Sequence, residues 1–361
     1  MTIETEALPG LRVDQVGSLL RPPELIEVFE LYARGQASEE QLRQAQDESI
    51  RQLVAKQESR GFPILTDGEH RRRNFQDSFG SSVAGFADST LAVRDRQPTV
   101  ERLRLMNNRP LEEFRFIHSI ANKPVKVTLI GPDRITQRFE WERSCAVYPT
   151  IDDFIADVVA IERQMVGELV AEGCRYVQID APGYTAYLDP VTTAPMIGRG
   201  EDPTKNIARS LQADNAIIEG FSGVTFGIHL CRGGKPGAHR RSGSYEMIAE
   251  QMFNTLHHHR FLLEYDTERA GGFEPLRFVP RGKIVVLGLL STKAGKLELE
   301  DDLKRRIDEA SKYLSLEQLA LSPACGFGGG PTSGRRMDEE EQWAKLGLVQ
   351  KVAGDIWGSC G

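Results

Sequence analysis

Along the chain, the spacing of hydrophobic residues changes repeatedly between the pattern of a β-strand and that of an amphipathic helix. Short runs rich in β-branched and aliphatic residues recur along the whole sequence, and longer amphipathic stretches separate them. This repeated order of strand and helix is typical of a parallel β-sheet whose strands are connected by helices. Eight such runs are present, at 13–17, 63–67, 125–131, 176–180, 223–230, 261–265, 283–290 and 319–323.

Two of the amphipathic stretches have well-marked boundaries. Residues 38–61 begin with Ser38 and acidic residues and end with Gly61, and residues 150–173 follow the same design from Thr150 onward. A hydroxyl residue at the first position, acids in the first turn and a closing glycine are the residues that helix ends favour. Both stretches therefore predict long amphipathic helices.

The fold class that this order favours is α/β. Eight strand-helix alternations predict a (β/α)8 TIM barrel in preference to an open doubly wound sheet, whose glycine fingerprint for nucleotides is absent from the sequence. Residues 90–118 fit an inserted hairpin or helix over one face of the barrel. No stretch rich in Pro, Gly or Ser divides the chain, so we expect residues 1–361 to form a single barrel domain.

Composition excludes several classes of protein. With 40% hydrophobic and 27% charged residues the chain resembles an ordinary globular protein, and no apolar run approaches the roughly 20 residues of a membrane span. The acidic first ten residues are not a secretory signal, so we expect a cytoplasmic protein without a membrane partner. A net charge of −7 argues against nucleic acid as a partner, and an oligomer is compatible with the sequence.

Candidate chemistry gathers where the predicted strands end. In a barrel of this type active residues lie at the carboxyl ends of the strands and in the loops that follow them. The sequences "DGEHRRRN", "QIDAP", "HLC", "EYDTERAG" and "SPACG" all occupy such places. Charged residues after strands also serve as helix caps and solvated loop residues, so position alone does not assign them a role.

A possible metal site stands out among these segments. In "GVTFGIHLC" the period of two puts His229 and Cys231 on one side of a strand, while Glu264 closes the next strand and Cys325 follows the last one. Cys, His and carboxylate donors suit a tetrahedral Zn²⁺, and two thiolates disfavour Mg²⁺ or Ca²⁺. The alternative is that the cysteines are small buried hydrophobic residues, as free cysteines usually are.

The ordered motifs resemble a known family. "VGSLLRP", "LTDGEHRRRNF", "TLIGP", "YVQIDAP", "GIHLC" and "SPACG", spread from residue 16 to 326, are similar to the catalytic barrel of the cobalamin-independent methionine synthases. The resemblance implies a catalytic zinc bound by His229, Cys231, Glu264 and Cys325. It also implies a methyltransferase of the short, single-barrel branch, in which zinc keeps the thiol of homocysteine deprotonated for attack on a methyl donor.

The resemblance also implies how the acceptor is held. The carboxylate of homocysteine would lie at the backbone amides of Gly17 and Ser18, and its ammonium group between Glu69 and Asp180. For these two acids a helix-start or loop role is the alternative. No catalytic residue beyond the zinc-bound thiolate is assigned.

Departures from the family pattern leave the methyl donor open. Arg138 stands where the folate-using enzymes place an aromatic residue, with Trp141 three residues later, so methyl-folate is one donor among others. A second hypothesis is an epoxide donor with coenzyme M as the thiol, a reaction of the same superfamily, for which the arginines of "HRRRNF" would suit the sulfonate. A third is a zinc- and thiol-binding protein without catalysis.

Overall fold

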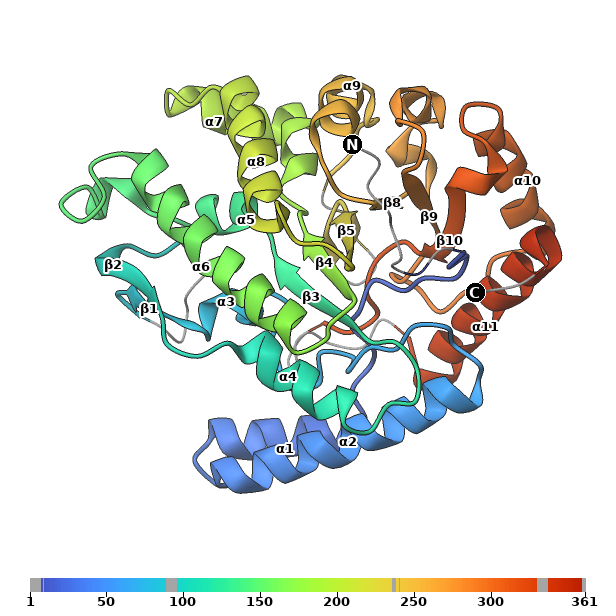
Figure 1. The fold of residues 1–361 in the computed structure, drawn as a ribbon, viewed down its shortest axis with the longest axis horizontal. Coiled ribbons are helices and arrows are strands. Elements are labelled where there is room, and N and C mark those ends of the chain that lie inside the picture. Colours follow the sequence, from blue (N-terminus) through green and yellow to red (C-terminus); the bar gives the residue numbers. More distant parts are fainter. Residues whose placement is uncertain are drawn as a thin grey trace.

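A parallel β-sheet surrounded by helices forms the centre of the computed structural model, which describes residues 8, 10–88, 96–235, 238–239, 241–329 and 337–358 (Figure 1). The sheet has six strands in the order β10-β9-β8-β5-β4-β3, and every neighbouring pair is parallel. The strands are β3 (Lys126–Ile130), β4 (Tyr176–Asp180), β5 (Thr225–Leu230), β8 (Arg260–Glu264), β9 (Ile284–Leu290) and β10 (Leu319–Pro323). The expected α/β class with a parallel sheet is confirmed.

Two extended segments join the edges of this sheet. Val13 makes an isolated parallel bridge to Leu321 of β10, and Leu65 makes one to Val125 beside β3. A third parallel bridge, between Ser18 and Gly68, connects the two segments with each other. The runs predicted at 13–17 and 63–67 thus lie where two further strands would lie, but they form single bridges in place of ladders.

Buried side chains explain why these two segments are irregular. Gln57 accepts from the backbone N–H of Thr66 and donates to its carbonyl, and Gln178 donates to the carbonyl of Val16 at 2.7 Å. The hydroxyl of Thr66 donates to the carbonyl of Gly17, also at 2.7 Å. Because side chains satisfy these backbone groups, the segments do not need a regular ladder to be buried.

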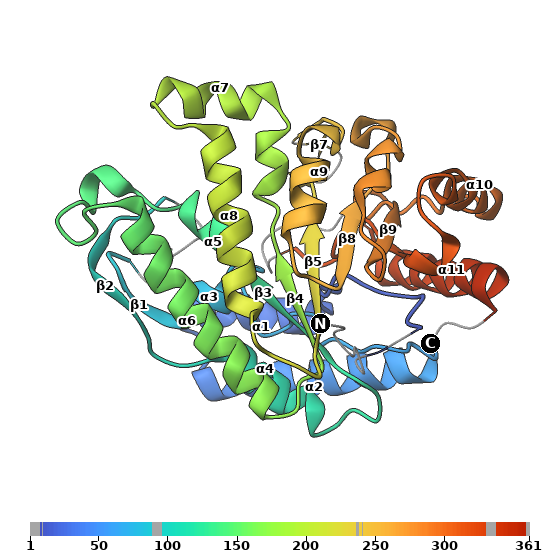
Figure 2. The same cartoon turned by 45° about the horizontal axis from the view of Figure 1, so that its top comes forward.

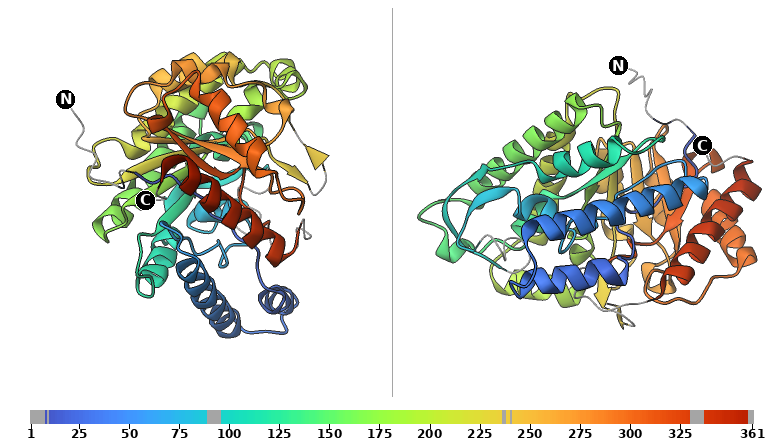
Figure 3. Two further views of the ribbon diagram at one scale, coloured as in Figure 1. Left: turned by 90° about the vertical axis from the view of Figure 1, so that its right-hand side faces the viewer. Right: turned by 90° about the horizontal axis from the view of Figure 1, so that it is seen from below.

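The helices cover the outer face of the sheet, as Figure 2 shows for α6, α8 and α9 in front of the strands. The longer ones are α1 (Pro23–Ala33), α2 (Glu39–Ser59), α4 (Arg109–His118), α6 (Ile151–Ala171), α7 (Pro190–Gly198), α8 (Pro203–Ile218), α9 (Glu246–Thr255), α10 (Glu300–Ser311) and α11 (Glu339–Trp357). Helices α1 and α2 lie side by side along one edge of the molecule (Figure 3).

The two helices predicted from their boundaries form as expected. Helix α2 begins with a capping box between Ser38 and Gln41, and α6 begins with one between Thr150 and Asp153. Each box satisfies two backbone N–H groups that the first turn leaves without partners. The buried positions of α2 recur at helical spacing, and Ile50, Leu53 and Val54 pack into the main hydrophobic core, so burial of one face stabilises the helix.

Residues 90–118, which were predicted to form one insertion, belong in the structure to a hairpin and to a helix of the helical layer. An antiparallel hairpin of β1 (Val83–Phe86) and β2 (Thr99–Leu105) begins before residue 90, and residues 89–95 lie outside the described residues. Helix α4 is not part of an insertion, because it packs against β3 and α6 within the helical layer. Its buried residues Leu111, Phe114 and Ile117 recur every third position, which gives the helix one apolar face.

Candidate metal centre and substrate cavity

The two ring nitrogens of His229, near the end of β5, have different surroundings. Its Nδ1 lies 3.1 Å from the carbonyl oxygen of Leu262 on the neighbouring strand β8. A proton on Nδ1 makes that hydrogen bond and leaves Nε2 with a lone pair. Nε2 is buried and has no hydrogen-bond partner among the described residues. A buried nitrogen of this kind, oriented by a carbonyl on its other side, is the usual arrangement of a metal-binding histidine.

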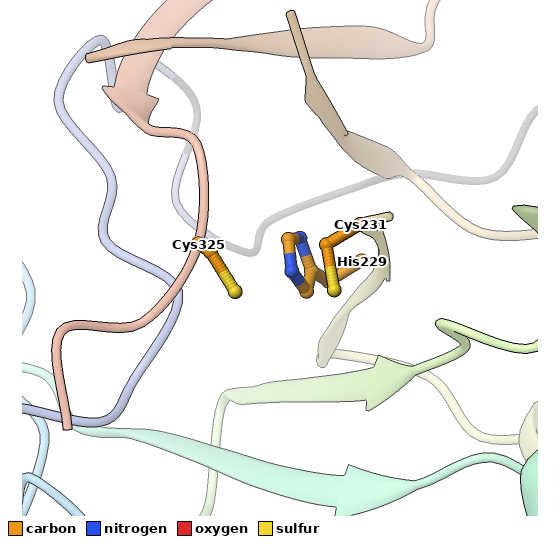
Figure 4. Close-up of side chains that lie close together, drawn as sticks. All are labelled: His229, Cys231 and Cys325. Atoms are coloured by element: carbon orange, nitrogen blue, oxygen red, sulfur yellow. The ribbon is translucent and has the colours of Figure 1, made fainter. Parts of the chain in front are cut away.

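Two cysteines complete a compact group of donors with this histidine. Cys231 directly follows β5, and Cys325 follows β10, so Cys325 reaches the group from another part of the sheet (Figure 4). One donor atom of each of the three residues lies within 4.8 Å of the other two. Sulfur and imidazole nitrogen are the donors that Zn²⁺ prefers in proteins. His229 and Cys231, which the period of two placed on one side of the strand, are thus grouped with Cys325, which was expected to join them from the end of the last strand.

The two thiols are electrostatically unequal. A hydrogen bond from Cys325 lowers the pKa of Cys231 well below its usual range, although burial opposes this. The same bond, together with burial, raises the pKa of the Cys325 thiol. Burial lowers the pKa of His229, but Cys231 and the carboxylates of Asp180 and Glu264 outweigh it and raise the pKa. The pKa values of the two neighbouring thiols are thus shifted in opposite directions.

Glu264, the fourth predicted ligand, lies beside this group without joining it. Its side chain is fully buried, and its Oε1 pairs with the ammonium of Lys293 at 2.6 Å and with the guanidinium of Arg269. Its Oε2 accepts from the backbone N–H of Arg232 at 2.5 Å. The Glu264 carboxylate is therefore held by two cations and one amide, and the three-residue donor group excludes it.

A cavity of about 300 Å³ opens beside the donor group. Ser18, Glu69 and Asp180, which were predicted to bind substrate, line this cavity together with the two cysteines. Gly17 lies next to it, since a Cβ on Gly17 would stand 2.7 Å from Thr128 Cγ2 and 3.8 Å from Glu69 Oε1. Three of the predicted substrate residues thus line the same cavity as three of the four predicted metal ligands, His229, Cys231 and Cys325.

The two acids of the cavity differ in their partners. Glu69 has φ 59, a left-handed backbone conformation that is rare for a residue with a side chain. Its Oε1 accepts from Thr128 Oγ1 at 3.0 Å and lies 3.5 Å from Arg72 Nη1. Asp180 accepts from Gln178 Nε2 at 2.8 Å, and burial raises the pKa of Asp180 to about 7. Glu69 adds to this rise, so the two carboxyl groups are neighbours.

The arginines of "HRRRNF" do not face the cavity. Arg71 pairs with Asp47, Arg72 with Glu113, and Arg73 is more than half exposed beside Asp77. The cations among the lining residues are Arg134, Arg241 and Lys293. Sequence reasoning missed all three. Arg134 and Lys293 had a signal, because each lies shortly after the end of a strand: Arg134 in α5 (Pro132–Thr136) after β3, and Lys293 after β9.

Arg232, in the "HLCRGG" motif, has a structural role. Its side chain is fully buried and lies over the ring of Tyr245, 4.3 Å from the ring centroid. The guanidinium donates to the carbonyls of Glu264 and Gly243, both at 2.7 Å. Arg232 therefore fastens the end of β8 to the loop after β5, and it fixes the backbone that follows Cys231.

The fold and the site together define a class: an α/β protein whose parallel sheet carries a zinc-type donor group at the carboxyl ends of its strands. Residues 14–194 match the family described as the cobalamin-independent synthase catalytic domain. The chain belongs to the cobalamin-independent methionine synthase catalytic domain family, in its short form.

Similar proteins cover almost the whole chain. Protein YxjG of Bacillus subtilis, which is uncharacterized, is 35% identical over 97% of this chain and 95% of its own length. The methionine synthase of Pyrococcus furiosus is 23% identical over 96% of this chain and 93% of its own. A Listeria monocytogenes structure assigned as a vitamin-B12-independent methionine synthase superposes with a TM-score of 0.79 at 26% identity, covering 98% and 100% of the two chains.

A membrane-crossing helix was not expected from composition. Among the helices of the described residues, none is both long enough and apolar enough to span a bilayer.

Proposed function

We propose that the chain is a zinc-dependent methyltransferase that transfers a methyl group to the thiol of homocysteine to give methionine. One observation carries this proposal: His229 Nε2 and the two thiols of Cys231 and Cys325 form a compact donor group beside a cavity lined by acids. The names of the methionine synthases to which the chain is similar support the same reaction.

The residues present fit a zinc ion. His229 offers a buried nitrogen without another partner, and Cys231 and Cys325 offer two soft sulfur donors. Glu264 would serve as a fourth ligand only after release from Lys293 or Arg269, so at least one position is left for a substrate sulfur. Zinc, when bound, keeps a coordinated thiol deprotonated at neutral pH and thus nucleophilic.

The cavity residues supply partners for both charged groups of the acceptor. Glu69 and Asp180 together provide the carboxylates that an ammonium group requires. The backbone amides of Gly17 and Ser18 are proposed to hold the acceptor carboxylate, and Ser18 lies on the cavity wall. Burial of these groups excludes water and strengthens each interaction.

The finer fold assignment belongs to the same proposal. The six-stranded sheet, completed by the bridged segments at Val13 and Leu65, supports a (β/α)8 barrel, and we take residues 1–361 as one catalytic unit. A small thiol and a methyl or alkyl donor are the proposed partners. Cytoplasmic location and the lack of a nucleic-acid partner stay predictions from the sequence.

The test is metal analysis followed by product detection. Purified protein should contain about one zinc per chain, and homocysteine with methyl-folate or methylcobalamin should yield methionine. Coenzyme M with a small epoxide tests the second hypothesis, which the cavity cations Arg134 and Arg241 favour. A protein that only stores zinc would bind the metal and form neither product. Absence of zinc, with Cys231 and Cys325 freely alkylated, would refute the proposal.

A further inference from the structure

The turn that carries Glu69 has an unusual backbone. Gly68 has a φ of 67° and Glu69 a φ of 59°, so two consecutive residues lie in the left-handed region. Glycine adopts this region freely, but a residue with a Cβ does so at a cost in free energy, and the conformation persists only where the surroundings enforce it. The contacts around Glu69 must therefore include groups that hold its backbone.

Both polar groups of the Glu69 backbone have charged side chains as partners. The N–H donates to Asp67 Oδ1 at 2.9 Å. The carbonyl accepts from Nη2 of the buried Arg21 at 2.5 Å and from the backbone N–H of Arg72 at 3.0 Å. An aspartate that accepts from the amide two residues later forms a tight turn, and its charge strengthens the bond. Asp67 and Arg21 thus fix the peptide groups on the two sides of the Glu69 Cα.

The backbone conformation decides where the Glu69 carboxylate lies. The φ angle sets the direction in which Cβ leaves the chain relative to the preceding peptide group. In the conformation present, Oε1 of Glu69 accepts from Thr128 Oγ1 at 3.0 Å, and Glu69 lines the cavity beside Cys231 and Cys325. A backbone released from the left-handed region would direct the side chain elsewhere. The place of the carboxylate therefore depends on the groups that hold φ.

Asp67 does not face this cavity itself. A separate cavity of about 10 Å³, the space of about one water molecule, is lined by Asp67 and Glu69 among others. Among the described residues, Glu69 lines both cavities, whereas Asp67 is absent from the wall of the larger one. Asp67 can therefore affect a molecule in the larger cavity through Glu69, without touching that molecule.

We propose that Asp67 is a positioning residue that makes the site select thiols with an ammonium group, because it holds Glu69 in the conformation that places its carboxylate at the cavity. This inference rests on the proposed function, in which Glu69 binds the ammonium group of the acceptor. The part of Asp67 that acts is the oxygen that accepts from the Glu69 N–H. An asparagine at position 67 can provide such an oxygen, and an alanine cannot.

The selectivity of the site for an ammonium group tests the inference. It is the ratio of the association constant of homocysteine to that of 4-sulfanylbutanoate, which lacks the amino group, and titration calorimetry measures both. Asp67→Ala should lower this selectivity about fivefold, because Glu69 is no longer held in place. Asp67→Asn should stay within about twofold of the unmutated protein, because the accepting oxygen remains. An equal fall in both variants would assign the effect to the charge of Asp67 and would refute positioning.

Two further variants separate positioning from general damage to the fold. Asp202→Ala removes an equivalent bond, in which the N–H of Thr204 donates to Asp202 Oδ1 at 3.0 Å, and should leave the selectivity unchanged. Asp67→Ser offers a shorter acceptor and should fall between Asp67→Asn and Asp67→Ala. The inference is wrong if Asp202→Ala lowers the selectivity to the same extent as Asp67→Ala. It is also wrong if Asp67→Ala, or Asp67→Ser where the alanine variant does not fold, leaves the selectivity unchanged.

A double-substitution cycle distinguishes this inference from the proposed function. In a Glu69→Gln background, Asp67→Ala should cause no further loss of selectivity, because no carboxylate is left to position. A second loss of full size would mean that Asp67 acts on the acceptor independently of Glu69, contrary to the inference. If Glu69→Gln alone leaves the selectivity unchanged, the acceptor site of the proposed function fails, and the inference fails with it. If Glu69→Gln lowers the selectivity and Asp67→Ala does not, the inference alone fails.

Discussion

The ammonium group of Lys293 lies 2.6 Å from the carboxylate of Glu264, at the edge of the donor group formed by His229, Cys231 and Cys325. Lys293 is therefore paired with the carboxylate that the family resemblance assigns to zinc as a ligand. Metal and Lys293 compete for one oxygen, and the positive charge of Lys293 also repels a metal ion.

Removal of this cation should strengthen metal binding. We expect Lys293→Met to raise zinc affinity about tenfold, because Glu264 loses a competing partner and the site loses a positive charge; the affinity is measured by competition with a chelator. Lys296→Met changes an exposed lysine three residues away and should have no effect. Unchanged affinity in Lys293→Met would show that Glu264 does not contribute to the metal.

Loss of one sulfur donor should abolish tight metal binding. Cys325→Ser is expected to lower zinc affinity at least 100-fold, because a neutral hydroxyl is a poor zinc ligand. Cys174→Ser, at another buried free cysteine, is the matched control and should retain about one zinc per chain. Zinc content after dialysis, measured by atomic emission, distinguishes the two variants. Full retention of zinc by Cys325→Ser would mean that the ligands are misassigned.

Glu69 should select thiols that carry an ammonium group. In Glu69→Gln we expect homocysteine to bind about tenfold more weakly, because a charge-assisted contact becomes neutral. Binding of 4-sulfanylbutanoate, which lacks the amino group, should barely change. Titration calorimetry of both thiols provides the measurement, and Glu101→Gln, at an exposed acid, is the control. Equal weakening of both thiols would argue against this role of Glu69.

Much of the fold follows from local sequence, and the site follows only in part. Strands such as β5 and β8 were predictable because they are short runs rich in aliphatic and aromatic residues, and period two placed His229 and Cys231 together. The ion pairs of Glu264 were not predictable, because its partners Lys293 and Arg269 come from separate loops. Arg241 likewise reaches the cavity through tertiary packing that no spacing encodes.

Asp214 should make stability depend on pH. This buried residue of α8 accepts from Tyr184, and burial raises its pKa to about 8 from an unfolded value near 4. The folded state therefore binds the proton more tightly, and its contribution to stability is complete below about pH 4 and is lost as the pH rises through about 8. Asp214 should therefore contribute a fall in stability of about 1 kcal/mol per pH unit between pH 5 and 8, measured by melts at several pH values.

Substitution of Asp214 isolates its contribution to the pH dependence of stability. Asp214→Asn should reduce the fall of stability with rising pH, whereas Asp308→Asn, at an exposed acid, should keep the slope of the unmutated protein. If Asp214→Asn retains that slope, other groups cause it.

Arg232 should matter for stability more than for substrate choice. Arg232→Met should lower the free energy of unfolding by about 3 kcal/mol, because the carbonyls of Glu264 and Gly243 lose a buried charged donor. Chemical denaturation measures the loss, and Arg305→Met, at an exposed side chain, is the control. A stable Arg232→Met variant would contradict the structural role.

The central claim is that a thiol substrate completes a zinc site built by His229, Cys231 and Cys325. X-ray absorption of the zinc-loaded protein, with and without homocysteine, tests it most directly. We predict two sulfur neighbours at about 2.3 Å without homocysteine and a third sulfur at a similar distance when homocysteine is bound. A zinc environment that homocysteine leaves unchanged would contradict the account.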